Sequence, residues 1–355
     1  MFNTVKKICA VFAAAAVMLS LSACHKAGET ALKIDSENFT SGFYACALLT
    51  ADSEARTKAS EIKGQTAVDD TNKNYLDTKI DDKEYSQWVK DRALEICREM
   101  EAAKRLCEEN NVSTADYLEN AKTTAQYYWT NGYEEQYTLN GVSLETFKNF
   151  MAYDSYRAAY FEYMYGENGK EPVNEDDIKE QLEKNYAYVN VLSADLTGIS
   201  EAQADTMREQ MNTYADRIHS GESFVSIYNE INSTQYTDTD SIGGFSNTLA
   251  TVWSAAGTQY ESEYYDEAKD LAAGEVMVVT HKSENSVKST LLLIYKGDMF
   301  SDKNTNIGTL YSAARYDLKG DELEKAISDK AAALDFKEIK YATNVFKVKN
   351  IKSAE

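Results

Sequence analysis

The spacing of apolar residues predicts a chain that is mainly helical at both ends. Over residues 84–110, apolar side chains recur at intervals of three, four and seven, as on one face of an α-helix. We expect further helices over 113–129 and 143–165, and two more near the C-terminus over 311–318 and 321–334.

The segments around these helices are less regular. Residues 32–39 alternate and predict a short strand, followed by a helix from Thr40 or Ser41 to Leu49. Residues 52–82 are polar and predict a surface loop or weak helix. A second alternating stretch, 344–351, predicts a closing strand.

The pattern changes after residues 166–172, a linker that holds the only proline. Residues 186–192 predict a strand, and Ser200-Glu201-Ala202-Gln203 is a capping box that opens a helix. A polar loop and a helix near 264–271 precede two facing strands, 276–280 and 290–295. We therefore expect an α+β fold in which a small α+β module is inserted into a helical domain.

The N-terminus has the layout of an export signal. Lys6 and Lys7 precede an apolar run over 8–19, too short for a membrane-spanning helix of about 20 residues. Leu21-Ser22-Ala23-Cys24 resembles the lipobox of bacterial lipoproteins, in which the cysteine is diacylated and becomes the new N-terminus. An ordinary cleaved signal is the alternative.

These observations predict five segments. They are a signal peptide (1–23), a tether (24–31), an N-terminal helical segment (32–183), the α+β module (184–298), and C-terminal helices with a strand that complete the helical domain (299–355).

Charge excludes two classes of partner. The signal holds two lysines and no acidic residue, so without it the net charge is −23 (37 minus 2 basic, minus 58 acidic). Such a chain lacks the clustered cations that nucleic acids or anionic membrane surfaces require. With 43% hydrophobic and 27% charged residues, it has the composition of a folded, water-soluble body.

The cysteines do not predict a metal or redox site. Cys9 leaves with the signal and Cys24 is the expected lipid attachment site, which leaves Cys46, Cys97 and Cys107. Cys97 and Cys107 lie on one predicted helix, about 15 Å apart, too far for a disulfide. We expect buried, unpaired thiols, while pairing of Cys46 with either of the others stays open.

Local motifs do not indicate an enzyme. The sequence has no nucleophile elbow, zinc-protease motif, phosphate loop or dinucleotide fingerprint. Of the three histidines, His219 and His281 stand at element ends without an identifiable partner. We therefore expect no metal and no cofactor.

The 25 tyrosines are more informative, because two helices carry more rings than a small core can hold. Large, rigid rings can bind peptides at low entropic cost. The residues expected to form such a client-binding surface are Tyr127, Tyr128, Trp129, Tyr160 and Tyr163.

The order of these features resembles the PrsA/SurA-type extracytoplasmic foldases, which carry a parvulin-type peptidyl-prolyl isomerase module. Gly221-Glu222-Ser223-Phe224 matches the Gly-x-x-Phe turn of that module, and residues 271–276 match its Leu-x-x-Gly-Glu-Val motif. Gly243-Gly244 lies between them at a suitable spacing, and Tyr264 lies near an aromatic position that lines the proline pocket in the family.

The sequence departs from the family at its polar positions. Asn190 and Leu291 stand where the two family histidines are expected, and Gly244 is followed by Phe245-Ser246-Asn247 instead of Asp-Leu-Gly. The resemblance therefore implies a degenerate parvulin-like module without a confident catalytic residue. Its pseudo-site positions are Asn190, Gly243, Gly244, Tyr264 and Leu291.

The resemblance implies a lipid-anchored chaperone on the extracytoplasmic face of the membrane, which binds unfolded or newly secreted polypeptides. One alternative is an active isomerase with a non-standard site. A solute-binding lipoprotein is less favoured, because residues 84–165 are one long helical region. We expect no nucleic acid partner, and a homodimer stays open.

Overall fold

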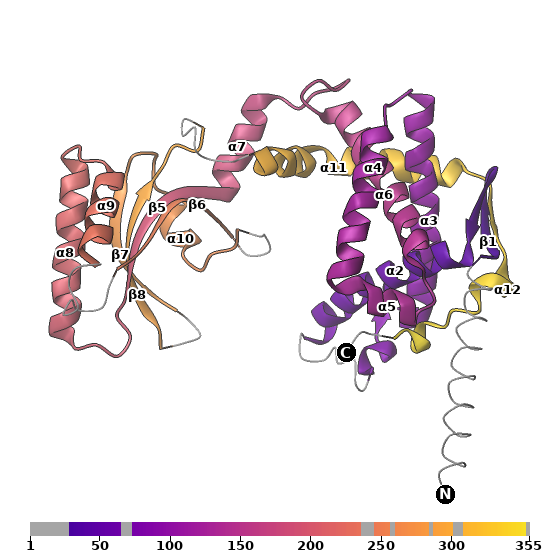
Figure 1. The fold of residues 1–355 in the computed structure, drawn as a ribbon, viewed down its shortest axis with the longest axis horizontal. Coiled ribbons are helices and arrows are strands. Elements are labelled where there is room, and N and C mark those ends of the chain that lie inside the picture. Colours follow the sequence, from indigo (N-terminus) through magenta and orange to yellow (C-terminus); the bar gives the residue numbers. More distant parts are fainter. Residues whose placement is uncertain are drawn as a thin grey trace, which may run out of the picture. The chain divides into compact units, whose positions relative to one another are not determined.

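The computed structural model describes residues 28–64, 73–235, 245–255, 260–283, 287–300 and 308–352. The fold is α+β, which confirms the expected class. The chain forms two compact units, and many of their elements are labelled in Figure 1. The helical unit comprises Met1–Pro172 and Lys319–Glu355, and the sheet unit comprises Val173–Leu318.

The helical unit is built on four long helices, with α2 packed on α3, α3 on α6 and α4 on α6. Their sequences explain where they begin, since the side chains of Thr40 and Ser143 accept hydrogen bonds from the backbone N–H groups of Phe43 and Thr146. The bounds are α2 (Ser41–Lys63), α3 (Tyr85–Glu109), α4 (Ala115–Tyr128), α5 (Glu134–Leu139) and α6 (Leu144–Tyr165).

Helix α2 is longer than the expected helix, which ended at Leu49. Ala51, Ala55 and Ala59 are fully buried at intervals of four, so small residues continue the packed face through a stretch that is polar overall. The helix ends at Gly64, whose φ of 88° suits glycine. Short elements follow, η2 (Asn74–Asp77), β3 (Lys79–Ile80) and β4 (Lys83–Glu84).

A three-stranded sheet in the order β2-β1-β9 joins the two ends of this unit. Its strands are β1 (Thr30–Ile34), β2 (Glu37–Thr40) and β9 (Phe336–Glu338). The prediction of a single strand over 32–39 is therefore wrong. This stretch forms a hairpin that turns at Asp35, which has a φ of 49°.

The C-terminal segment also differs from the elements predicted for it. The two expected tail helices are one helix, α11 (Gly308–Ala333), and the expected strand over 344–351 is absent from that stretch. A short helix, α12 (Lys340–Thr343), precedes it, and η4 (Val348–Asn350) lies within it. Val348 and Ile351 are buried three residues apart, the spacing of a 3₁₀ turn and not of a strand.

The sheet unit contains an antiparallel sheet in the order β6-β5-β8-β7. The strands are β5 (Tyr186–Asp195), β6 (Ser246–Ser254), β7 (Val276–Lys282) and β8 (Ser289–Lys296). Strand β6 was not predicted from the sequence, because it is polar and only partly buried along most of its length. Pairing with β5, and not an apolar pattern of its own, makes it a strand.

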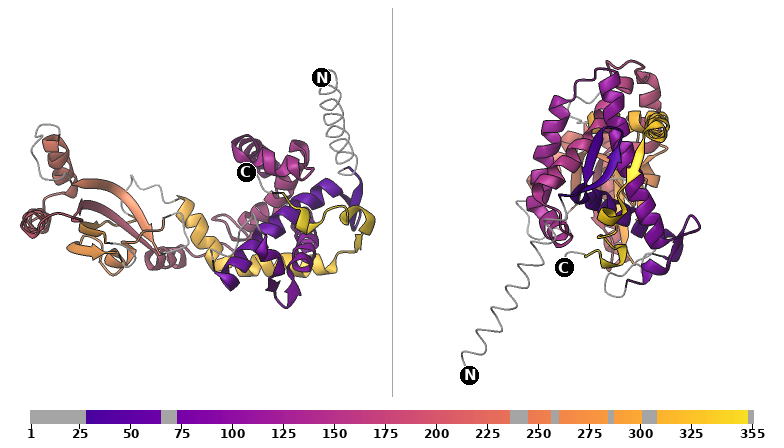
Figure 2. Two further views of the ribbon diagram at one scale, coloured as in Figure 1. Left: turned by 90° about the horizontal axis from the view of Figure 1, so that it is seen from below. Right: turned by 90° about the vertical axis from the view of Figure 1, so that its right-hand side faces the viewer.

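Helices cover both faces of this sheet (Figure 1 and Figure 2). Leu192, Leu291 and Leu293 face α8 and α9, whereas Leu292 and Ile294 face α10. The capping box at Ser200 is confirmed at the start of α8. The helices are α7 (Glu175–Asn185), α8 (Glu201–His219), α9 (Phe224–Gln235) and α10 (Tyr265–Ala268).

The sheet unit is wider than the module expected over 184–298. Ile178 and Leu182 of α7, together with Leu310 and Ala314 of α11, pack in one buried cluster with Tyr188. These contacts explain why the unit extends from Val173 to Leu318.

The three cysteines of the helical unit are buried and free, which confirms the expected unpaired thiols. Burial raises the pKa of Cys107 to about 11, so this thiol is protonated at neutral pH. None of the helices in the described part of the chain has the length and apolar character needed to cross a membrane. The signal segment and Cys24 lie outside the described residues.

Candidate functional site

Four tyrosines from the end of α4 through α5 form a row of contacting rings, which we call the tyrosine ladder: Tyr127, Tyr128, Tyr133 and Tyr137. The rings of Tyr128 and Tyr133 are stacked with centroids 5.6 Å apart, and those of Tyr133 and Tyr137 are stacked at 5.9 Å. Tyr127 contacts Tyr128 edge-on at 5.9 Å. Tyr127, Tyr128 and Tyr133 are 64%, 42% and 44% exposed, so the ladder offers aromatic surface to a partner.

The chain kinks between α4 and α5, within η3 (Trp129–Tyr133), and this kink aligns the rings. In a regular α-helix, residues five apart point about 140° away from each other. Asn131 and Gly132 leave the helical conformation, and Gly132 has a φ of 137°. This kink, and not a regular helix, places Tyr128 and Tyr133 so that their rings stack.

The ladder rests on buried aromatic side chains. Trp129 is only 7% exposed and lies 6.3 Å from Tyr137 and 5.8 Å from Phe147, measured between ring centroids. Tyr137 packs on Phe147 at 4.6 Å, and burial raises the pKa of Tyr137. Trp129 therefore supports the ladder from inside, and its burial does not fit the expected contact with clients.

The other expected client-binding residues lie on α6. Tyr160 is 8% exposed, so its burial likewise does not fit direct contact with a client. Its ring stacks on half-buried Tyr163 with centroids 6.1 Å apart. Tyr163 and Tyr117 line a shallow pocket of about 270 Å³. Among the expected residues, Tyr160 thus contacts Tyr163 and Tyr127 contacts Tyr128, while Tyr133 joins the ladder although it was not among them.

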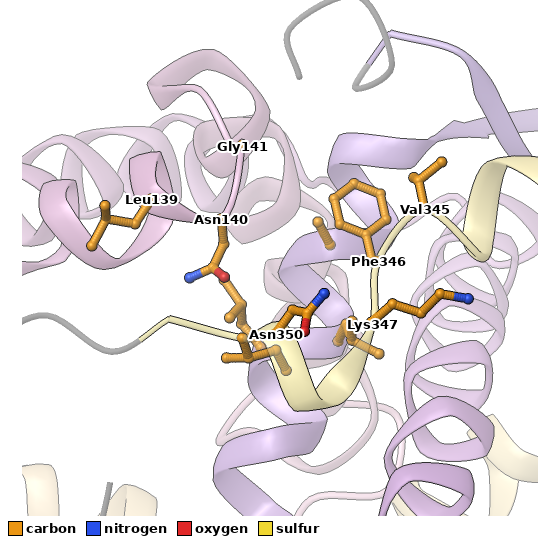
Figure 3. Close-up of a pocket in the computed structure, with 11 residues that line it drawn as sticks. Leu139, Asn140, Gly141, Val345, Phe346, Lys347 and Asn350 are labelled. Carbon is orange, nitrogen blue, oxygen red and sulfur yellow. The ribbon is translucent and has the colours of Figure 1, made fainter. Parts of the chain in front are cut away.

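An apolar pocket of about 250 Å³ lies at the end of α5, where Leu139 is one lining residue (Figure 3). Its volume is below the usual range for small-molecule sites, about 300–1,000 Å³, and suits one or two side chains. The apolar residues that line it are Ala45, Leu48, Leu49, Leu139, Val345, Phe346 and Ile351.

The C-terminal segment forms one side of this pocket and is held by polar contacts. The Asn140 side chain donates to the Lys352 carbonyl at 2.8 Å and accepts from the Lys352 N–H at 3.0 Å. Lys73 Nζ donates to the Ile351 carbonyl at 2.7 Å. The partners in these two contacts stand 212 and 278 positions apart in the sequence, so no local pattern predicts the pocket.

A second cluster lies on the α10 face of the sheet unit. Glu267 Oε1 is 3.1 Å from His281 Nδ1, and the His281 ring meets the Tyr264 ring edge-on at 5.0 Å. The Tyr264 hydroxyl donates to Thr290 Oγ1 at 3.5 Å, and burial raises the pKa of Tyr264. Trp253 packs on Tyr264 at 5.8 Å. The sequence indicates no partner for His281, whereas the fold provides two, Glu267 and Tyr264.

Two of the pseudo-site positions, Leu291 and Tyr264, lie on opposite faces of the sheet. Leu291 is 1% exposed and faces α8 and α9, whereas Tyr264 packs on the α10 side of the sheet. Thr290, one residue before Leu291, is the β8 residue that contacts Tyr264. The side-chain oxygen of Asn190 accepts from the Ala250 N–H at 2.9 Å, where the β5–β6 register shifts. Gly243 and Gly244 lie outside the described residues.

The arrangement offers two kinds of chemistry. The ladder and the pocket can bind apolar and aromatic side chains, whereas the cluster at His281 combines an imidazole, a carboxylate and a phenol hydroxyl. Within the residues that the structure describes, no group of three or more His, Cys, Asp or Glu could hold a metal ion.

No family model matches the sequence, and neither does any curated protein. Two solved structures are similar over most of the chain. The foldase protein PrsA of Lactococcus lactis is 11% identical, with 88% of this chain and 96% of that chain covered and a TM-score of 0.37. The foldase protein PrsA of Streptococcus pneumoniae is 13% identical, with coverage of 68% and 82% and a TM-score of 0.36. At these values the similarity supports neither a shared site nor a shared activity.

Proposed function

We propose that this protein is an extracytoplasmic chaperone that binds unfolded polypeptides through the tyrosine ladder and the adjoining pocket. One observation carries the proposal: three tyrosines with 42–64% exposure contact one another on a single face of the helical unit. Exposed aromatic clusters on a water-soluble fold are typical of interaction sites. Tyrosine suits many different clients, because it combines large contact area with few rotatable bonds and a polar hydroxyl.

The pocket complements the ladder. Its size lets it take an apolar side chain of a client while the rings of the ladder contact other residues of the client. Each aromatic contact adds only about 0.5–1.5 kcal/mol beyond the area it buries. Such a surface binds reversibly, which a chaperone requires in order to release its clients.

Substitution of the exposed rings tests this proposal. We expect Tyr127→Ser, Tyr128→Ser and Tyr133→Ser together to raise several-fold the concentration needed to suppress aggregation of an unfolded client. Tyr341→Ser is the matched control, because Tyr341 is 70% exposed in the same unit. Circular dichroism checks that both variants fold. A folded triple variant that suppresses aggregation as well as the parent protein refutes the proposal.

We further propose that a lipid on Cys24 anchors the protein to the extracytoplasmic face of the membrane. Support comes from the Leu21-Ser22-Ala23-Cys24 motif, and two acyl chains are sufficient for stable anchoring. Cys24→Ala should release the protein from the membrane fraction or leave its signal uncleaved. Membrane association that persists in this variant, with no lipid mass on the N-terminal peptide, contradicts the anchor.

The parvulin-like module is proposed to be degenerate, because Asn190 and Leu291 stand at its expected histidine positions. A specific observation favours the second candidate, an isomerase with a non-standard site: His281, Glu267 and Tyr264 contact one another on one face of the sheet. A prolyl-isomerase assay on a short X-Pro peptide separates the two. Absence of catalysis supports degeneracy, whereas a rate that His281→Gln abolishes supports the second candidate.

A further inference from the structure

The segment that carries the tyrosine ladder has a net negative charge. Between residues 115 and 139 there are four acidic residues and one basic residue, a local net charge of −3. All five of these charged side chains are exposed: Asp116, Glu119, Lys122, Glu134 and Glu135.

Some carboxylates of the helical unit have cationic partners. On α3, Glu99 pairs with Arg92, and Glu101 pairs with Arg105. By contrast, Glu134 and Glu135 form neither an ion pair nor a side-chain hydrogen bond with any other residue in the described ranges of the chain. They form the first turn of α5, directly after Tyr133. The acidic groups nearest the ladder in sequence are therefore left to interact with solvent or with a partner.

Exposed tyrosine faces and unpaired carboxylates attract the same chemical group. The face of an aromatic ring is negative, so a guanidinium or ammonium group placed over it is stabilised. A neighbouring carboxylate adds an ion pair to the same cation. The competing explanation is that Glu134 and Glu135 only stabilise the start of α5 through its helix dipole.

We propose that the tyrosine ladder prefers unfolded segments in which lysine or arginine stands beside apolar residues. The inference rests on the proposed function and specifies its clients. The apolar residues of such a segment would contact the rings and the pocket, while the basic side chain would lie between the rings and the α5 carboxylates. Segments whose apolar residues are flanked by Asp or Glu would be repelled.

Three short peptides test this preference. They share the same apolar core and are flanked by lysine, by serine or by aspartate, and each is titrated with the full-length protein. Fluorescence anisotropy should show the lysine peptide binding about tenfold more tightly than the aspartate peptide, the size expected from one exposed cation–π contact plus one exposed ion pair. The ratio of the two affinities, lysine peptide over aspartate peptide, should fall severalfold between about 50 mM and about 500 mM salt, because salt screens exposed charges.

Paired variants distinguish the possible outcomes. We expect Glu134→Gln with Glu135→Gln to reduce the ratio to about threefold or less, since the ion-pair contribution is lost. The control Glu61→Gln, on exposed α2 surface, should leave the ratio unchanged. Equal binding of all three peptides overturns the preference but leaves the proposed function standing. If no peptide binds, the proposed function fails with it. A double variant that retains the full ratio shows that the α5 carboxylates act only within their helix and overturns the inference.

Discussion

Gly132 allows the most direct test of how the fold presents the tyrosine ladder. Its φ of 137° and ψ of −12° lie in a region that side chains strongly disfavour. A Cβ atom added there would meet nothing within 4 Å, so Gly132→Ala introduces no steric clash with neighbouring groups. The cost is therefore backbone strain alone, about 1–3 kcal/mol.

Two results can follow, and both are measurable. If the turn persists, strain of about 2 kcal/mol lowers the Tm of a unit of this size by about 4–8 °C. If the chain escapes by forming a regular helix, Tyr128 and Tyr133 separate by about 140° around the axis and the ladder is lost. Calorimetry detects the first result, and the aggregation-suppression assay detects the second.

Gly28→Ala provides the control, because a Cβ there also meets nothing within 4 Å and its φ lies outside the positive region. It should change neither Tm nor suppression. The reasoning is refuted if Gly132→Ala keeps its Tm within about 1 °C of the parent protein and suppresses aggregation equally well, since a strain of about 1 kcal/mol already implies a larger shift.

Three further substitutions test interactions inside the helical unit or inside the sheet unit. Tyr85→Phe removes a buried hydroxyl that donates to Asp52 Oδ1 at 3.0 Å. Urea unfolding should show that the free energy of unfolding falls by about 1–3 kcal/mol, and a fall of less than about 0.5 kcal/mol contradicts this role. Gly297→Ala places a Cβ 2.5 Å from the buried Tyr188 ring, so it should cost about 1–3 kcal/mol by the same measurement; an unchanged midpoint would show that the ring moves freely. Burial raises the pKa of Glu101 above 4.5, so its contribution to stability is greatest below pH 4.5 and is lost as pH rises through the raised pKa. Glu101→Gln should therefore destabilise the protein more near about pH 4 than at about pH 7, and equal costs at both pH values contradict the assignment.

The sequence by itself determined those elements whose structure depends on residues close to one another along the chain. The apolar periodicity of α3 and the capping side chain of Ser143 predict two long helices that the fold contains within one or two residues. The capping box at Ser200 sets the start of α8, and Gly221, with a φ of 96°, follows its end. These signals work because hydrogen bonds within a helix and its caps join residues only a few positions apart.

Only the tertiary structure decided the features on which the proposed sites depend. Strand β6 exists because β5, from a distant part of the sequence, supplies its hydrogen-bond partners, and the tail around Ile351 is held by the equally remote Lys73 and Asn140. His281 gains its two partners only when α10 packs on the sheet. Likewise, Trp129 is buried whereas Tyr127 and Tyr128 are exposed, although the three aromatic residues are consecutive in the sequence. Such outcomes depend on which surfaces meet in three dimensions, and local composition carries little information about that.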